Sequence, residues 1–110
     1  MERFVKGDVV VLPFPYTDFS SVKKRPAVVI ATLKGNNAIL AQITTNQRND
    51  EDLISLTKKD FASGSLISDS FIMASLIFTT DSSKVKYKAG KIKPEKIKQV
   101  ENKLCEIFTR

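Results

Sequence analysis

The stretch AVVIATLKGNNAILAQITT, residues 27–45, carries the pattern that decides the fold. Its first seven residues form a short apolar run rich in β-branched side chains, which predicts a strand covered on both faces. The sequence KGNN at 34–37 is typical of a tight turn, and residues 38–45 then form the predicted return strand. We therefore expect an antiparallel hairpin, in which the start of one strand and the end of the other lie together at the open end.

Further strands are predicted on both sides of this hairpin. Before it, Gly7 and Asp8 lead into the β-branched run VVVLPF at 9–14, which Pro13 and Pro15 are expected to stop, and a polar loop follows at 15–24. The segments predicted after the hairpin are, in chain order, a loop at 46–52, a strand at 52–57, a loop at 58–65 with room for a helical turn, one long or two bent strands at 70–80 and a short solvated edge strand within 84–92.

The final segment, 94–108, shows a helical period instead. Pro94 suits a first helical position, and Glu95 suits the positive end of the helix dipole. The apolar side chains that recur at helical spacing are Ile97, Val100, Leu104, Ile107 and Phe108. A run of strands followed by one helix, without βαβ alternation, predicts a small, mostly antiparallel β-barrel with a C-terminal amphipathic helix, built as a single domain over 1–110.

The amino-acid composition limits the partners and the kinds of catalytic or metal site that the chain can have. The chain has 18 Lys and Arg against 12 Asp and Glu, a net charge of +6 that favours polyanionic partners. It has no histidine and one cysteine, Cys105, so that His-based catalysis, His or thiolate metal sites and an intramolecular disulfide are excluded, and we expect no metal or cofactor. No apolar run approaches the ~18 residues that cross a bilayer, and the N-terminus lacks the apolar core of a signal peptide, so a cytoplasmic protein is expected.

Three cations, Lys23, Lys24 and Arg25, stand directly before Pro26. A residue that precedes proline is pushed toward extended conformations, so Arg25 is expected at the mouth of the strand and the two lysines in the loop. A guanidinium held there could bind a phosphate through two hydrogen bonds. The alternative is a basic loop that only keeps a sheet edge soluble, and spacing alone leaves both interpretations open.

The sequence ITTNQ at 43–47 lies where the return strand ends. Counting outward from the KGNN turn, Arg25 is a close neighbour of Thr44 or Thr45. Threonine hydroxyls can hold a phosphate oxygen or orient a ribose hydroxyl, and the amides of Asn46 and Gln47 can contact base edges. The alternative is two β-forming residues followed by ordinary turn residues.

Two other features are compatible with nucleic-acid binding. Phe14, Tyr16 and Phe19 could stack on unpaired bases, or they could close the core beneath the first loop. Lysines recur between residues 84 and 98, where they could form a nucleic-acid-binding stripe or only a solvated face.

The stretch GDVVVLPFPYTDFSSVKKRPAVVI at 7–30 resembles the opening of the MazF/PemK-type toxins of bacterial toxin–antitoxin pairs. A Gly-Asp before the first strand and an Arg-Pro that opens the second are hallmarks of that family. The similarity continues in the same order through AQITTNQ at 41–47, SFIMASLIFTTD at 70–81 and GKIKPEKIKQVENKL at 90–104, and thus covers nearly the whole chain.

This resemblance implies an SH3-like barrel, a symmetric homodimer and a metal-independent endoribonuclease that cuts single-stranded RNA and is held inactive by an antitoxin with an acidic tail. By position, Arg25 would be the catalytic arginine and Thr44 the catalytic threonine. The residues that the resemblance places along the RNA groove are Phe14, Tyr16, Asp18, Lys23, Lys24, Thr45, Asn46, Gln47 and Ser75.

The chain also departs from the family pattern. Some relatives carry an arginine and an acidic residue where this chain has Met73 and Ser75, and a proline is frequent where it has Gln42. Methionine cannot bind a phosphate and serine is a weak base, so Asp18 and Asp69 become candidate bases, between which the sequence does not choose. The alternative function is a non-catalytic toxin of the same fold, which binds RNA or poisons gyrase as CcdB-type toxins do.

Overall fold

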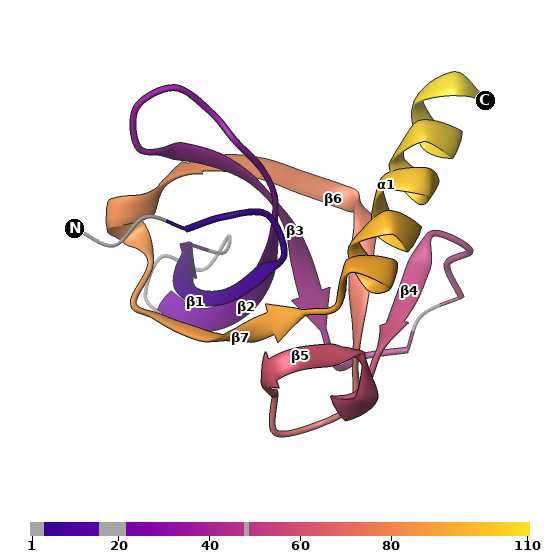
Figure 1. Cartoon of the computed structure of the whole chain (residues 1–110), viewed down its shortest axis with the longest axis horizontal. Coiled ribbons are helices and arrows are strands. Elements are labelled where there is room, and N and C mark those ends of the chain that lie inside the picture. Colours follow the sequence, from indigo (N-terminus) through magenta and orange to yellow (C-terminus); the bar gives the residue numbers. More distant parts are fainter. Residues whose placement is uncertain (1–3, 16–21, 48) are drawn as a thin grey trace.

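The computed structural model describes residues 4–15, 22–47 and 49–110. Within these ranges the chain forms one seven-stranded sheet and one α-helix (Figure 1). The elements are β1 (Asp8–Pro15), β2 (Val22–Thr32), β3 (Asn37–Thr44), β4 (Leu53–Leu56), the 3₁₀ turn η1 (Lys58–Asp60), β5 (Phe61–Gly64), β6 (Ser70–Asp81), the 3₁₀ turn η2 (Ser82–Lys84), β7 (Tyr87–Ile92) and α1 (Pro94–Thr109).

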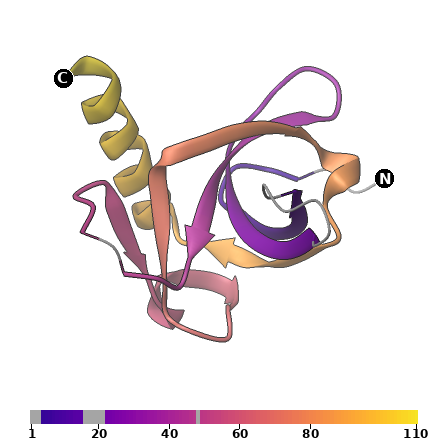
Figure 2. The ribbon, with the colours of Figure 1, turned by 180° about the vertical axis from the view of Figure 1, so that it is seen from behind.

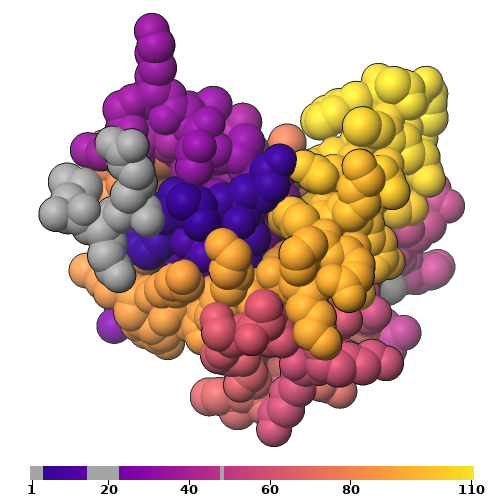
Figure 3. All heavy atoms as spheres, in the orientation of Figure 1, coloured from indigo at the N-terminus to yellow at the C-terminus, as the bar shows by residue number. Residues whose placement is uncertain are grey.

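The strands are ordered β4-β6-β3-β2-β1-β7-β5, and each neighbouring pair is antiparallel. The sheet curls into an open half-barrel, and α1 lies beside β6 and β4, away from the curl of β1 and β2 (Figures 1 and 2). In the space-filling view the β2–β3 turn stands out at one corner of the molecule and α1 at another (Figure 3). The predicted antiparallel barrel with a C-terminal helix is confirmed. No helix in the described ranges is long and apolar enough to span a lipid bilayer.

The β2–β3 hairpin forms as the sequence predicts and is buried on both faces. Val28 and Ile30 belong to one apolar cluster, and the alternating residues Ala27 and Val29 belong to the other. The larger cluster joins the sheet to α1 through residues such as Val100, whereas the smaller one fills the curl of β1, β2 and β3. Complete burial of a side chain of this size contributes about 1.5–3 kcal/mol, so β2 stabilises both halves of the core.

β1 runs through Pro13 and Pro15 rather than stopping at them. The Val11 carbonyl accepts a hydrogen bond from the N–H of Lys86, so the backbone polar groups of Val11 face β7. The nitrogens of Pro13 and Pro15, two and four residues later, point to the same side, past the end of β7. The missing N–H groups are therefore not needed by the β1–β2 ladder.

Three further expectations are corrected. β2 begins at Val22, because Lys23 pairs with Phe14 and Lys24 with Pro13, so both lysines lie in the strand and not in the loop. The predicted loop at 58–65 contains a helical turn, as expected, but it also contains β5. Because β5 pairs with β7, β7 lies between two strands instead of at a solvated edge.

Candidate functional site

Arg25 and Thr44 lie at the open end of the β2–β3 hairpin, two residues beyond its last paired residues. Paired residues run outward as far as Ala27 and Gln42, and two further steps along each strand place Arg25 opposite Thr44. Opposite residues of an antiparallel pair carry their side chains on the same face of the sheet. The register up to Ala27 and Gln42 is consistent with the predicted neighbourhood of Arg25 and Thr44, which stays a prediction.

Thr44 is held in a defined position. Its side chain is buried, with 6% of the residue exposed, and its Oγ1 accepts a hydrogen bond from the backbone N–H of Asn46 at 3.1 Å. A hydroxyl that accepts in this way still has its own hydrogen to donate. Thr44 therefore combines a fixed oxygen with a donor at the mouth of the hairpin.

Arg25 is half-buried and pairs with Leu12 of β1, on the face that also carries Phe14. The ring of Phe14 packs edge-on against Phe78, with centroids 5.1 Å apart and an interplanar angle of 76°. Phe14 thus belongs to the edge of the smaller core, which favours the core-closing interpretation of this residue. Tyr16, Asp18 and Phe19 lie outside the described residues.

An apolar cavity of about 560 Å³ opens on this face. Its lining is mostly apolar and includes Leu12, Phe14, Leu76 and Phe78. Gln42 also lines it, and Lys84 contributes a positive charge. Because Gln42 lies two residues before Thr44 in β3, its side chain is on the same face as that of Thr44.

The opposite face of the same strands carries a second, more polar groove of about 490 Å³. Continuing the hairpin register by one more step places Lys24 opposite Thr45, on the face away from Arg25. Both line this groove, together with Tyr87 and Lys88 of β7 and the segment 65–70. The predicted site residues are therefore divided between the two faces of the sheet.

Asp8 explains the Gly-Asp motif at the start of β1. Its buried carboxylate accepts a hydrogen bond from the Val5 N–H at Oδ2 (2.9 Å), while Oδ1 lies 3.1 Å from Nζ of Lys88 and 3.8 Å from Nζ of Lys91. Oδ1 has no hydrogen bond of good geometry within the described part of the chain, so the two ammonium groups offset its charge electrostatically.

The lysine-rich segment 84–98 does not form one continuous stripe. Lys88 and Lys91 face Asp8, and Lys96 lies 3.6 Å from Asp60 and donates a hydrogen bond to the Ser55 carbonyl at 2.9 Å. These contacts favour a structural role for part of the segment. Across residues 4–15, 22–47 and 49–110, no three Cys, Asp or Glu side chains gather as a group that could hold a metal ion.

The remaining candidates lie at or near the hairpin mouth. Lys23, Asn46 and Gln47 are exposed, as is Ser75. The register between β3 and β6 shifts between Ala41, which pairs with Ile77, and Ile43, which pairs with Ile72. The β6 residues 73–76 therefore pass beside a single β3 residue, Gln42.

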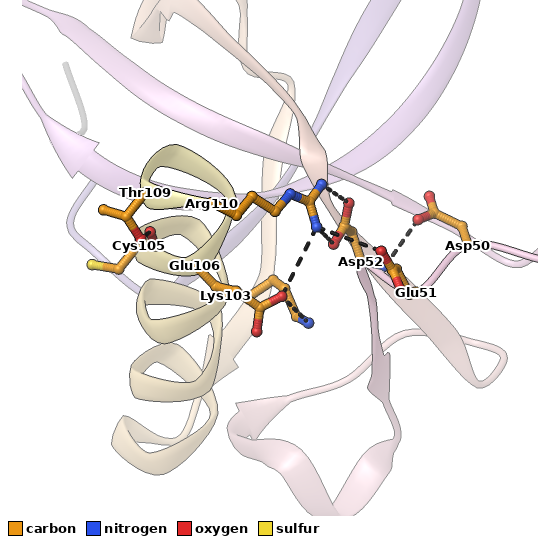
Figure 4. A network of polar contacts seen from close by, with 8 residues as sticks. All are labelled: Asp50, Glu51, Asp52, Lys103, Cys105, Glu106, Thr109 and Arg110. Carbon is orange, nitrogen blue, oxygen red and sulfur yellow. Dashed lines mark hydrogen bonds and ion pairs between the residues drawn. The ribbon is translucent and has the colours of Figure 1, made fainter.

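An ion-pair cluster fixes the far end of the β3–β4 connection (Figure 4). The guanidinium of Arg110 donates hydrogen bonds to both carboxylate oxygens of Asp52, at 3.2 and 3.0 Å, and lies 3.6 Å from Glu51 and 3.9 Å from Glu106. The hydrogen bond with Asp52 raises the pKa of Arg110 above its ordinary value. The Asp52 N–H in turn donates to Oδ1 of Asp50 at 2.9 Å.

A model of the family described as the PemK-like, MazF-like toxins of type II toxin–antitoxin systems matches residues 5–108. The chain belongs to this family. By sequence comparison, no significant match was found among curated proteins.

Solved structures of MazF proteins share the fold of this PemK/MazF-like chain. MazF from Deinococcus radiodurans superposes with a TM-score of 0.78 at 15% identity and covers 100% of both chains. An endoribonuclease in complex with its cognate antitoxin, from a mycobacterial species, gives a TM-score of 0.76 at 13% identity over 96% of this chain and 94% of that one. The Mycobacterium tuberculosis toxin MazF-mt6 gives 0.72 at 13% identity, over 92% and 95%.

Within this PemK/MazF-like fold, the two departures in β6 have different surroundings. Met73 is 4% exposed and pairs with Leu53 of β4, so its thioether belongs to the core. Ser75 is exposed and offers only a neutral hydroxyl. Neither side chain provides an ionisable group on this strand.

Sequence reasoning did not single out Tyr87 of this PemK/MazF-like chain, and it considered Lys88 only as one of the lysines of the 84–98 segment. The groove that they line depends on the pairing of β7 with β1, which joins residues as distant in the chain as Asp8 and Lys91. The alternation of lysine with other residues at 84–88 was the only local signal, and it equally fits a solvated strand.

Proposed function

We propose that this toxin is an endoribonuclease that cuts single-stranded RNA without a metal ion, with Arg25 and Thr44 as its catalytic residues. The observation that supports the proposal is the register of the β2–β3 hairpin: continued two residues beyond Ala27 and Gln42, it sets a half-buried arginine and a fixed threonine hydroxyl opposite each other, on one face, at the open end. The net charge of +6 favours a polyanionic substrate.

In the proposed reaction, the ribose 2′-oxygen attacks the adjacent phosphorus as the proton of the 2′-hydroxyl passes to solvent water. The bond from phosphorus to the 5′-oxygen breaks, and that oxygen takes up a proton, so the products carry a 2′,3′-cyclic phosphate and a 5′-hydroxyl. Arg25 holds the non-bridging oxygens through two hydrogen bonds and stabilises their growing charge. The Thr44 hydroxyl donates to the phosphate or orients the attacking hydroxyl.

Cleavage of a long unstructured RNA in the presence of EDTA tests this function. We expect fragments with cyclic phosphate ends from the wild type, and a loss of at least about 10²-fold in rate for Arg25→Ala, which is typical when one charge-stabilising donor is removed. The far-UV circular dichroism spectrum of the variant is the control for folding. Undiminished cleavage by Arg25→Ala would refute the role given to this residue.

The β6 departures favour a second candidate, a toxin that binds without cutting RNA. Because Met73 is buried and Ser75 is neutral, these two positions of β6 offer no ionisable group to a phosphate or a proton. A gyrase poison of the CcdB type would trap cleaved DNA when gyrase is present and leave RNA whole. One gel with both substrates therefore distinguishes the two functions.

We further propose that the protein works as a cytoplasmic homodimer and is inhibited by an antitoxin with an acidic tail. The apolar cavity beside Gln42, with Lys84 at its edge, suits a tail that places an apolar side chain in the cavity and carboxylates near the cations. A peptide of this character should compete with RNA, and sedimentation should give twice the monomer mass. Failure of an acidic peptide to compete would contradict this mode of inhibition.

A further inference from the structure

We propose that the groove on the Lys24 face is a subsite for one unpaired nucleotide of the RNA, on the opposite side of β2 from Arg25 and Thr44. This inference rests on the proposed ribonuclease function and extends it. The groove is separate from the apolar cavity beside Gln42, because the two share no lining residue.

Three neighbouring strands build the apolar floor of the groove. Val11 of β1 pairs with Pro26 of β2 on one side and with Tyr87 of β7 on the other, so the three side chains lie in a row on one face. Tyr87 is 55% exposed at the end of this row. An aromatic ring that is exposed in this way offers a surface on which a base can stack.

Lys24 brings positive charge to this floor. It is exposed and lies two residues before Pro26, hence on the same face of β2. Its ammonium group has three N–H donors that suit a phosphate. Lys88 also lines the groove, but it pairs with Val10, so its side chain is on the other face of β7 from that of Tyr87, with its ammonium group 3.1 Å from Oδ1 of the buried Asp8.

Hydroxyl groups complete the lining. They come from Thr45, Ser65, Ser68 and Ser70. Ser70 donates its hydrogen to the Ser68 carbonyl at 3.0 Å, so that it presents an acceptor oxygen to the groove. Hydroxyls of this kind suit ribose hydroxyls and base edges, without demanding one base.

The combination fits a nucleotide better than it fits an apolar ligand or a free anion. A ring for the base, the ammonium group of Lys24 for the phosphate and hydroxyls for the sugar are collected in about 490 Å³, within the usual range for small-ligand clefts. Lys24 and Arg25 are adjacent in the chain and point to opposite faces, so an RNA strand held at Arg25 reaches the groove by passing over the mouth of the hairpin.

The test is equilibrium binding of a fluorescent, uncleavable 2′-O-methyl hexanucleotide, followed by anisotropy. We expect Tyr87→Ala to weaken binding by about 5- to 150-fold, which corresponds to one lost base stack, and Tyr87→Phe to stay within about 3-fold because the ring remains. Lys24→Ala should weaken binding and lower the salt dependence by about one phosphate contact. Lys86→Ala, an exposed lysine outside the groove, is the charge-matched control.

Cleavage assays separate this inference from the function on which it rests. If the wild type cuts RNA and Tyr87→Ala binds the hexanucleotide as tightly as the wild type does, the subsite is refuted and the ribonuclease stands. If Tyr87→Ala loses binding while the wild type cuts no RNA, the subsite stands and the ribonuclease fails. If both hold, Tyr87→Ala should raise KM for long RNA and leave the cleavage of a dinucleotide unchanged.

Discussion

Asp52 and Arg110 are 58 residues apart in the chain, yet two hydrogen bonds join their side chains. The carboxylate of Asp52 is 9% exposed, whereas the guanidinium side chain of Arg110 is 47% exposed. The pair thus connects Arg110, which directly follows α1, to Asp52 at the end of the β3–β4 connection, residues 45–52. Asn46 and Gln47 lie near the start of this connection. A contact outside the proposed catalytic pair therefore restrains a segment that the proposed function uses.

Arg110→Ala should loosen the β3–β4 connection, because it leaves the buried Asp52 carboxylate without its guanidinium. We expect faster hydrogen exchange at the amides of 49–53 and a lower thermal midpoint. Arg110→Lys keeps the charge but loses the two-pronged geometry, so its effect should be intermediate. Equal exchange rates in all three proteins would show that the contact does not restrain this segment.

Thr44→Val should lower both stability and RNA cleavage. The Asn46 N–H loses its acceptor, which costs about 1 kcal/mol of unfolding free energy, and the donor to the phosphate disappears. Thr44→Ser keeps the hydroxyl and should retain most activity. Urea denaturation and initial cleavage rates measure the two effects, and a fully active Thr44→Val protein would exclude a catalytic hydroxyl.

Arg25→Lys distinguishes charge from geometry at the hairpin mouth. A lysine supplies one positive charge but cannot form the two parallel hydrogen bonds of a guanidinium. We expect cleavage at least about 10-fold slower than in the wild type but faster than in Arg25→Ala. A lysine variant as slow as the alanine variant would indicate that the planar geometry contributes the whole effect.

Gly90→Ala should destabilise the contact between β5 and β7. A Cβ atom at this position would lie 2.5 Å from the Ser63 carbonyl oxygen and 3.0 Å from the ring of Phe61. We expect a loss of about 1–3 kcal/mol in the unfolding free energy, as for other overpacked sites. Gly35→Ala is the comparison, because Gly35 has a φ of +72° but nothing within 4 Å, so only backbone strain of about 1 kcal/mol opposes it.

Glu101 should contribute to the pH dependence of stability. The hydrogen bond that Lys6 donates to its Oε2, at 2.6 Å, lowers the pKa of Glu101. A carboxylate with a lowered pKa in the folded state stabilises fully above about pH 4.5, and this contribution is lost as the pH falls through the folded value.

The comparison variant for this pair is Glu101→Gln. It should lower the thermal midpoint slightly near neutral pH and leave it unchanged at about pH 2. The effect should be small because water screens the half-exposed pair. Lys6→Met should add nothing to Glu101→Gln, and full additivity of the two changes would exclude a direct interaction.

The sequence predicts well those parts of the fold that depend on residues close to one another in the chain. The apolar run at 27–33, the KGNN turn and the return strand define the β2–β3 hairpin by themselves. Pro94 and the 3.6-residue period of the apolar side chains predict the helix, which ends one residue beyond the predicted end. The expectation that Arg25 and Thr44 are neighbours comes from counting along this same hairpin, and it stays a prediction.

The parts that escaped prediction depend on contacts between distant segments. β5 has only four residues and is a strand because β7 pairs with it, and β7 lost its expected edge position for the same reason. The lysines of β7 have the pattern of a solvated strand, yet Asp8 at the start of β1 binds two of them. No local pattern links Asp8 to Lys88, so the polar groove was not predictable.

Lys24 and Arg25 point to opposite faces of β2. For the proposed activity, the number of residues in this segment therefore matters more than its exact composition. Insertion of one residue between Arg25 and Pro26 would exchange the faces of these two cations, because the register of β2 is fixed from Pro26 onward. Substitutions leave that parity intact, whereas a single-residue insertion at this point inverts it. In a library of variants that differ in the number of residues inserted here, RNA cleavage should therefore be lower for odd numbers than for even numbers. An insertion of two residues should be tolerated better than an insertion of one.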